Sequence, residues 1–176
     1  KPSYDLPLPE PIDWEDAFPI VMAQAAILFD LERRDLLTVC RSSAEIRTAL
    51  ASGKMAAIFH IEGAEAIDPD LDALHLFHAM GLRSLGPVWS RSTIFGHGVP
   101  FRYPSDGDIG PGLTAEGKAL VARCAELGMI VDTSHLNMAG FWDVGAARLP
   151  LVSTHSNCYE ISKGARNLTD PQLRAI

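Results

Sequence analysis

Short apolar runs alternate along this chain with longer segments that end at glycines. Met55–Ile61 is apolar almost throughout, and Arg83–Val88 and the run that begins at Met129 are of the same kind. Such runs are typical of strands that are buried on both faces of a parallel sheet. Leu71–Met80 and Thr114–Leu127 are predicted to be helices, because a glycine closes each of them. The alternation of strands and helices predicts parallel β/α units.

The first part of the chain and one long connection depart from this alternation. Residues 1–12 form a lead-in that is rich in proline. Trp14–Arg34 has apolar residues at helical spacing, and Pro19 is expected to break this helix or to start a new first turn. Ser90–Gly112 contains five glycines and three prolines. A connection of that length without regular structure predicts a functional loop or lid.

The composition is that of an ordinary globular protein. The 176 residues suit one domain, and 47% of them are hydrophobic and 21% charged. The net charge is −7 (15 − 22) and no basic block is present, which argues against a nucleic-acid partner. The cysteines, Cys40, Cys124 and Cys158, are too widely spaced for a disulfide framework. The chain has no apolar run long enough for a membrane span and no signal-peptide pattern, which favours a cytoplasmic location.

Two histidines and one glutamate follow predicted strands and form a candidate metal site. The run Met-Ile-Val-Asp-Thr-Ser ends at His135, and the run Leu-Pro-Leu-Val-Ser-Thr ends at His155. Glu62 directly follows an earlier strand. Because ligand-binding residues of parallel β/α folds lie at the carboxyl ends of the strands, we expect these three side chains to converge. Two imidazoles and a carboxylate are a typical ligand set of catalytic zinc.

Other polar residues near these positions are weaker candidates for the metal site. His60 lies inside a strand and is expected to pack there, whereas His97 lies on the long loop and could face the site. Asp106 and Asp108 are typical of a turn. Asp132, three residues before His135, is a candidate for orienting a metal ligand.

Arg166 and Trp89 are candidates for substrate contact. Arg166 follows His155, and an arginine beside a metal site suits a bidentate clamp on a carboxylate. Without that site it would be an ordinary surface charge. Trp89 falls at another predicted strand end.

These residues resemble the membrane (renal) dipeptidase family of zinc metallopeptidases, over most of the chain from about Ser42 onward. The matching segments occur in the family's order and are Ile61-Glu62-Gly63-Ala64, Gly81-Leu82-Arg83, Gly112-Leu113-Thr114-Ala-Glu-Gly117, Leu127-Gly128-Met129-Ile130-Val131-Asp132-Thr133-Ser134-His135, His155-Ser156-Asn157 and Arg166-Asn167-Leu168-Thr169-Asp170. Several linked motifs in one order make the match specific.

The resemblance implies a (β/α)8 TIM-type barrel of the metal-dependent hydrolase kind that cleaves dipeptides with two zinc ions. Glu62 would be the catalytic carboxylate that bridges both ions, and His135 and His155 would complete the ligands of one of them. Arg166 would bind the free carboxylate of the dipeptide while a metal-activated hydroxide attacks the peptide carbonyl. The resemblance is also compatible with a homodimer.

Three departures from the family pattern are visible. The family's His-x-Asp pair, which binds the other zinc ion, does not occur in this sequence, and neither does its late-strand aspartate. Trp89 stands where the family has a histidine that polarises the scissile carbonyl, and an indole can donate a hydrogen bond but carries no charge. We therefore expect residues 1–176 to be one domain-sized part of a larger barrel. Alone, this part should bind metal poorly and be inactive or prone to aggregate.

Two alternatives to the dipeptidase hypothesis stay open. The first is a related amidohydrolase-type barrel that acts on another amide, an ester or a lactone, and Trp89 is the residue that favours it. The second is a non-catalytic binding domain that has lost its first metal site, which the missing His-x-Asp pair would explain.

Overall fold

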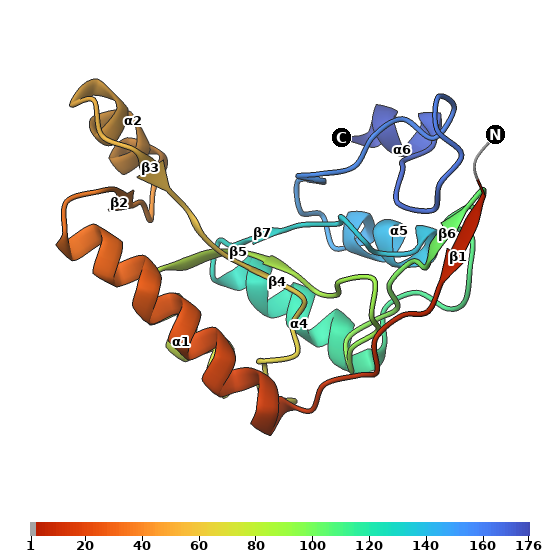
Figure 1. Ribbon diagram of the computed structural model, residues 1–176, viewed down its shortest axis with the longest axis horizontal. Helices are drawn as coiled ribbons and strands as arrows, with labels where there is room; N and C mark the ends of the chain where they lie inside the picture. The colour runs from red at the N-terminus through yellow and green to blue at the C-terminus, as the bar shows by residue number, and fades with distance from the viewer. Residues whose placement is uncertain (1–2) are drawn as a thin grey trace. The chain divides into compact units, whose positions relative to one another are not determined.

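The computed structural model of this chain describes residues 3–176, which divide into two units. One unit comprises residues 12–61 and 65–84, and the other comprises residues up to 11, 62–64 and 85–176. Figure 1 labels the helices and strands. The chain passes between the units several times, and the metal-site candidates Glu62, His135 and His155 all belong to the second unit.

Three helices and a small parallel sheet make up most of the first unit. Its elements are α1 (Trp14–Arg33), β2 (Thr38–Val39), α2 (Ser43–Ala51), β3 (Ala56–Ala57) and α3 (Asp72–Met80). Strands β2 and β3 pair in parallel. Two further strands, β4 (Phe59–Glu62) and β5 (Leu82–Gly86), contribute residues to both units.

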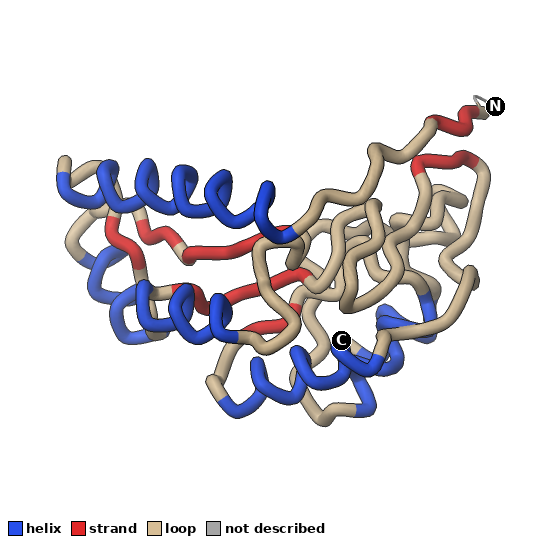
Figure 2. Tube along the Cα trace, turned by 90° about the horizontal axis from the view of Figure 1, so that it is seen from below, coloured by secondary structure: helices blue, strands red, loops and turns tan. Residues whose placement is uncertain are grey.

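Aromatic side chains hold α1 against β4 and α3 within the first unit. Phe29 of α1 meets Phe59 of β4 edge-on at 6.0 Å between ring centroids, and Phe18 of α1 lies 5.6 Å from Phe77 of α3. In Figure 2 the long helix runs alongside the strands of this unit. Contrary to the expected break, α1 continues through Pro19. Proline removes only one helical hydrogen bond, and near the start of a 20-residue helix that loss is tolerated.

The second unit carries the remaining strands and helices. They are β1 (Tyr4–Leu6), β6 (Phe101–Tyr103), α4 (Ala115–Glu126), β7 (Ile130–Val131), α5 (Met138–Ala146) and α6 (Asp170–Ala175). Its core consists of fully buried side chains such as Leu85, Phe95, Leu120 and Phe141. The central sheet has the strand order β4–β5–β7.

The sheet is extended at its carboxyl edge by backbone hydrogen bonds. These run from Gly63 N to Gly86 O (3.1 Å), from Asp132 N to Leu85 O (2.9 Å) and from Thr133 N to Val152 O (2.8 Å). Asp132 and Val152 also form a parallel bridge. These bonds bring together the strand ends at which Glu62, His135 and His155 lie.

The lead-in and the long loop pair with each other, which the sequence did not predict. Strand β1, inside the proline-rich lead-in, pairs antiparallel with β6, inside Ser90–Gly112. The rings of Tyr4 and Tyr103 stack across this pair of strands, with their centroids 6.0 Å apart. The hydrophobic pattern did not reveal these two strands, because each is only three residues long and is flanked by prolines.

The predicted mixed α/β architecture is confirmed, and the predicted helices appear with shifts of one or two residues at their ends. Within residues 3–176 the strands do not close into a barrel. That the chain is a single domain of a larger barrel stays a prediction. None of the helices in the described part of the chain has the length and apolar character needed to cross a membrane.

Candidate metal centre

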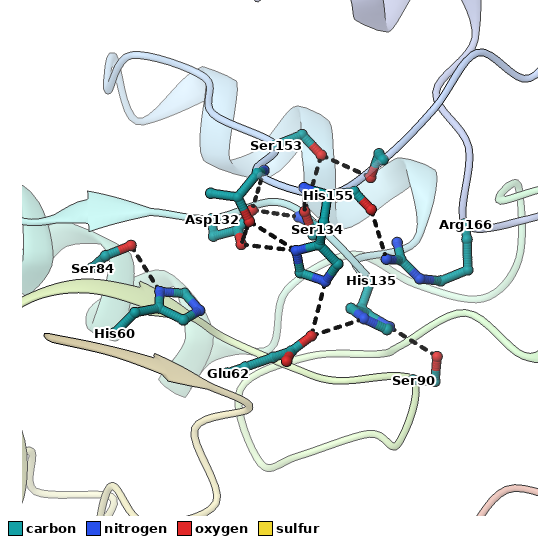
Figure 3. Close-up of polar contacts among 12 residues, drawn as sticks. His60, Glu62, Ser84, Ser90, Asp132, Ser134, His135, Ser153, His155 and Arg166 are labelled. Atoms are coloured by element: carbon teal, nitrogen blue, oxygen red, sulfur yellow. Dashed lines mark hydrogen bonds and ion pairs between the residues drawn. The ribbon is translucent and has the colours of Figure 1, made fainter. Parts of the chain in front are cut away.

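Glu62, His135 and His155 converge on one point at the carboxyl edge of the sheet. The Nε2 atoms of both histidines lie 2.9 Å from the same Glu62 oxygen, Oε1 (Figure 3). One ligand atom from each residue lies within 4.8 Å of the other two. Glu62 ends β4, His135 follows β7, and His155 follows the segment that pairs with β7. Among residues 3–176, this is the group of acidic, histidine and cysteine side chains that could hold a metal ion.

The donor set and its orientation fit a divalent metal cation. Both imidazoles direct Nε2 to the shared point, while their Nδ1 atoms lie against hydroxyl groups. Nδ1 of His135 is 2.9 Å from Ser90 Oγ, and Nδ1 of His155 is 2.8 Å from Thr154 Oγ1. Metal-binding histidines usually make such a contact through the second ring nitrogen, which fixes the tautomer and the ring.

His135 is buried, uncharged and held by its backbone. Its side chain is 5% exposed, and burial, followed by electrostatic effects of Arg166 and His155, lowers its pKa to about 3 against an opposing effect of Asp132. The neutral ring keeps a lone pair for a cation. His135 also has a φ of 70°, which costs an L-residue about 1–2 kcal/mol. Its carbonyl accepts a hydrogen bond from Val99 N at 2.9 Å, which helps to maintain this conformation.

Asp132 lies beneath the two histidine-bearing loops and joins them. Its Oδ1 accepts hydrogen bonds from the backbone N–H groups of Ser134 and Thr154, both at 3.0 Å, and its Oδ2 accepts one from the Thr154 hydroxyl at 2.5 Å. Burial raises the pKa of Asp132, but the hydrogen bonds from Thr154 and Ser134 outweigh it and leave the pKa below its ordinary value. The carboxylate is therefore ionised and rigidly placed.

Arg166 lies beside His155 and has one unused nitrogen. Its Nη2 donates to the carbonyl of His155 at 3.0 Å. Its Nη1 is shielded from solvent and has no hydrogen-bond partner in the described part of the chain. Burial lowers the pKa of Arg166, while the charges of Glu62 and Asp132 oppose the shift. A buried guanidinium N–H without an acceptor is costly, and an incoming anion would satisfy it.

Trp89 forms an aromatic wall next to His135. The indole ring lies 6.0 Å from the His135 ring and meets Phe101 edge-on at 5.1 Å, and the guanidinium of Arg91 lies 5.4 Å from its centroid. Trp89 is half-buried. The structure thus places this residue close to the metal-site candidates, as its position after a strand indicated.

The remaining candidates have other roles. His60 Nδ1 contacts Ser84 Oγ at 2.8 Å, inside the first unit. Asp108 N donates to Asp106 Oδ1 at 3.1 Å, so this pair makes the predicted turn. Sequence reasoning missed the hydroxyls of Ser90 and Thr154. The direct succession of Thr154 and His155 was a signal, but only the fold brings Ser90 to His135.

The chain matches known proteins along most of its length. The family model described as membrane dipeptidase (peptidase family M19) matches residues 8–176. A crystal structure of a metallopeptidase from Rhodobacter sphaeroides, liganded with a phosphinate mimic of the dipeptide L-Ala-D-Ala, is 54% identical with a TM-score of 0.97 and covers all of this chain. This chain covers 51% of that one.

Two curated relatives show the range of similarity. An uncharacterised protein of Acinetobacter calcoaceticus, encoded in the PQQ-III 3' region, is 45% identical over 141 residues, which are 80% of this chain and 45% of the relative. The dipeptidase verJ of Clonostachys rogersoniana is 26% identical over 155 residues, which are 86% of this chain and 39% of the relative. The chain thus spans about half the length of the proteins that it matches.

Proposed function

We propose that this chain, which belongs to the membrane dipeptidase family (peptidase family M19), supplies one metal site and the substrate carboxylate anchor of a zinc-dependent dipeptidase. The observation that carries the proposal is the meeting of Glu62, His135 and His155 within 4.8 Å. Membership of this family favours dipeptide hydrolysis over the two alternatives, a hydrolase for another amide, ester or lactone and a non-catalytic binding domain.

Glu62 is proposed as the carboxylate shared between two cations. Both histidines contact its Oε1, and its carboxylate would be shared between the cation that they hold and a second one. His135 and His155 would complete the ligands of the first ion with neutral Nε2 atoms. Zinc held by these residues would polarise the scissile carbonyl and lower the pKa of water at the site. The choice of zinc rests on the nitrogen and oxygen donor set, which other divalent metals also accept.

Arg166 is proposed to bind the free carboxylate of the dipeptide. Its unpaired Nη1 would donate to a carboxylate oxygen, while Nη2 stays on the His155 carbonyl. Because Arg166 reaches the backbone of a metal ligand, the anchored carboxylate would lie close to the cation. This arrangement would require the scissile bond to lie next to the carboxyl end of the substrate, which excludes cleavage in the interior of longer peptides.

Trp89 is proposed to contact the substrate from the His135 side. Its ring lies 6.0 Å from His135 and is backed by Phe101. It offers an apolar face and one N–H donor, which suits an uncharged part of the substrate.

Metal analysis and dipeptide hydrolysis on the intact protein test the proposal together. We expect the wild-type protein to contain zinc and to hydrolyse dipeptides but not their C-terminal amides. His155→Gln and Glu62→Gln should lower the zinc content and reduce hydrolysis by more than about 100-fold, because each removes a ligand of the ion that activates water. His75→Gln, the same change at an exposed histidine of α3, is the control and should change neither.

Two results would contradict the proposal. One is an unchanged zinc content in His155→Gln, and the other is hydrolysis that stays at the wild-type rate in Glu62→Gln. A panel that adds lactones and esters to the dipeptides would reveal the related hydrolase activity. We also propose a homodimer and a cytoplasmic location, which light scattering and cell fractionation, respectively, would test.

A further inference from the structure

A chain of hydrogen bonds leads from the buried carboxylate of Asp132 through the Thr154 hydroxyl to Nδ1 of His155, the ring nitrogen that does not contact Glu62. Thr154 Oγ1 lies 2.5 Å from Asp132 Oδ2 and 2.8 Å from His155 Nδ1 (Figure 3). We propose that Asp132 and Thr154 are positioning residues that hold the proton of His155 on Nδ1 and so present Nε2 to the cation. This inference rests on the proposed metal site but goes beyond its ligands.

The direction of the hydrogen bonds follows from counting protons. Oδ1 of Asp132 already accepts two backbone N–H groups, from Ser134 and Thr154, so the carboxylate acts as an acceptor. A threonine hydroxyl has one proton, which it donates to Oδ2. Its oxygen can then only accept, and the atom within reach is Nδ1 of His155, which must carry a hydrogen. With a proton on Nδ1, Nε2, which lies 2.9 Å from Glu62 Oε1, is the ring nitrogen whose lone pair would bind a cation.

Thr154 is needed because Asp132 does not reach the ring. Oδ2 of Asp132 lies 3.7 Å from His155 Nδ1, which is too far for a direct hydrogen bond. The hydroxyl of Thr154 bridges this gap. The carboxylate thus acts on the ligand through the threonine.

The two histidines differ in exposure, so the hydroxyl contact at Nδ1 is more important for His155 than for His135. His135 is 5% exposed and lies 6.0 Å from the Trp89 ring, so packing restricts its ring in addition to the contact with Ser90 Oγ. His155 is 42% exposed. A ring that is open to solvent can rotate and exchange tautomers, so its orientation depends on Thr154.

The experiment compares three variants of the intact protein. Thr154→Val removes the hydroxyl and keeps the shape of the side chain, whereas Thr154→Ser restores the hydroxyl. The matched control is Thr133→Val, because the Thr133 hydroxyl lies on the same pair of loops but donates to the Val152 carbonyl at 2.8 Å and touches neither histidine. Asp132 is left unchanged because it also holds the backbone of both loops.

The measurement is the dissociation constant of zinc, determined by competition with a chromophoric chelator. Thr154→Val should weaken zinc binding by about 10- to 100-fold, which is typical when the outer partner of a metal-binding histidine is lost. Thr154→Ser and Thr133→Val should bind zinc as the wild type does. The visible absorption of the cobalt-substituted protein should change in Thr154→Val alone, and thermal unfolding of the metal-free variants checks that each is folded.

The outcomes separate this inference from the proposed function. Wild-type zinc affinity in Thr154→Val overturns it, and so does equal weakening in Thr133→Val and Thr154→Val, which would indicate general damage to the loops. If the protein hydrolyses no dipeptide but Thr154→Val still weakens zinc binding, the proposed function fails and the positioning role stands. A wild-type protein without zinc affinity overturns both.

Discussion

Arg166 is half-buried, and one of its guanidinium nitrogens, Nη1, is shielded from solvent without an acceptor within residues 3–176. Nη1 has no partner among the described residues, and Nη2 is occupied by the His155 carbonyl. The sequence placed this arginine after a metal-site histidine but left a surface charge as the alternative. Only the structure shows that one nitrogen is buried and available, which favours an anionic ligand.

The first prediction concerns this arginine. Arg166→Met should lower kcat/KM for dipeptides by roughly 10- to 100-fold, since a hydrogen bond to a charged group is worth about 1.5–3 kcal/mol. Arg123→Met is the control, because Arg123 is an exposed residue of α4 that pairs with Glu126 at 2.9 Å. Steady-state kinetics measure both. An Arg166→Met enzyme with wild-type kcat/KM would rule out the carboxylate anchor.

The second prediction concerns the pH dependence of stability. The folded pKa of His135 is about 3, below its ordinary value of 6.5. Between these values the unfolded chain takes up a proton that the folded chain does not, so stability falls as the pH falls from 6.5 towards 3. For this one group the slope cannot exceed about 1.4 kcal/mol per pH unit.

Urea unfolding of the metal-free protein at pH 7 and pH 5 tests this prediction. The free energy of unfolding should be lower at pH 5, and His135→Asn should make the difference smaller. The same comparison in His75→Gln serves as the control, because His75 is exposed. An unchanged pH dependence in His135→Asn would show that this histidine is not kept neutral by the fold.

At the scale of the elements, hydrogen bonds hold the long connection between β5 and α4 to the segment that follows His135. Asn137 caps α5 by accepting from Gly140 N at 2.9 Å, and its amide donates to the carbonyls of Ile109 and Pro111. Gly98 forms a bridge with Leu136, next to His135. The sequence predicted a loop or lid here. The structure shows that these contacts tie the connection to the segment that carries His135.

The third prediction tests the role of Asn137. Asn137→Ala removes the cap and leaves two carbonyls without their donor, so it should lower the free energy of unfolding by about 2–4 kcal/mol. Ser42→Ala at the start of α2 removes only a cap, since Glu45 N bonds Ser42 Oγ at 3.2 Å, and should cost about 1 kcal/mol. Denaturant unfolding measures both. Equal losses in the two variants would show that the loop contacts contribute nothing.

The fourth prediction concerns the close approach of Gly98 to the backbone of Trp89, in the segment that follows β5. A Cβ at this position would lie 2.1 Å from the Trp89 carbonyl oxygen, so Gly98→Ala must displace the backbone that pairs with the His135 loop. We expect weaker zinc binding and a loss of stability. Gly145→Ala on α5 is the control, because its Cβ would make an ordinary contact at 3.4 Å and alanine favours a helix. Zinc titration and unfolding curves distinguish the two, and full zinc affinity in Gly98→Ala would contradict the prediction.

At the scale of the whole molecule, the described strands leave sheet edges unpaired. The central sheet has three strands, and β2 and β3 form a separate pair. Large apolar side chains such as Ile20 and Ile27 of α1 are exposed. Unpaired edges and exposed apolar residues favour association with other chains.

The fifth prediction follows from these edges. A protein made of residues 1–176 alone should form aggregates, bind zinc weakly and hydrolyse no dipeptide, whereas the intact protein should do all that the proposed function requires. Size-exclusion chromatography with light scattering, zinc titration and a dipeptide assay check this. A soluble monomer of the 176 residues that hydrolyses dipeptides would contradict it.

The pattern of the sequence was sufficient for the order of the helices and of the central-sheet strands, and for the three candidate ligands. Burial of alternating elements requires apolar runs of particular length, and glycines and capping residues mark their ends. Ligands at strand ends are recognisable because parallel β/α units bring those ends to one edge. For that reason Glu62, His135 and His155 were predictable from their positions alone.

Tertiary structure decided which side chains surround these ligands. The contact of Ser90 with His135, the bridge from Asp132 through Thr154 to His155 and the unused nitrogen of Arg166 depend on distances between segments far apart in the chain. The pairing of β1 with β6 likewise joins two short segments that have no strong strand pattern. Periodicity reports which face of an element is buried, but the partners of a polar atom are set by how the elements pack, and that is information only the folded chain contains.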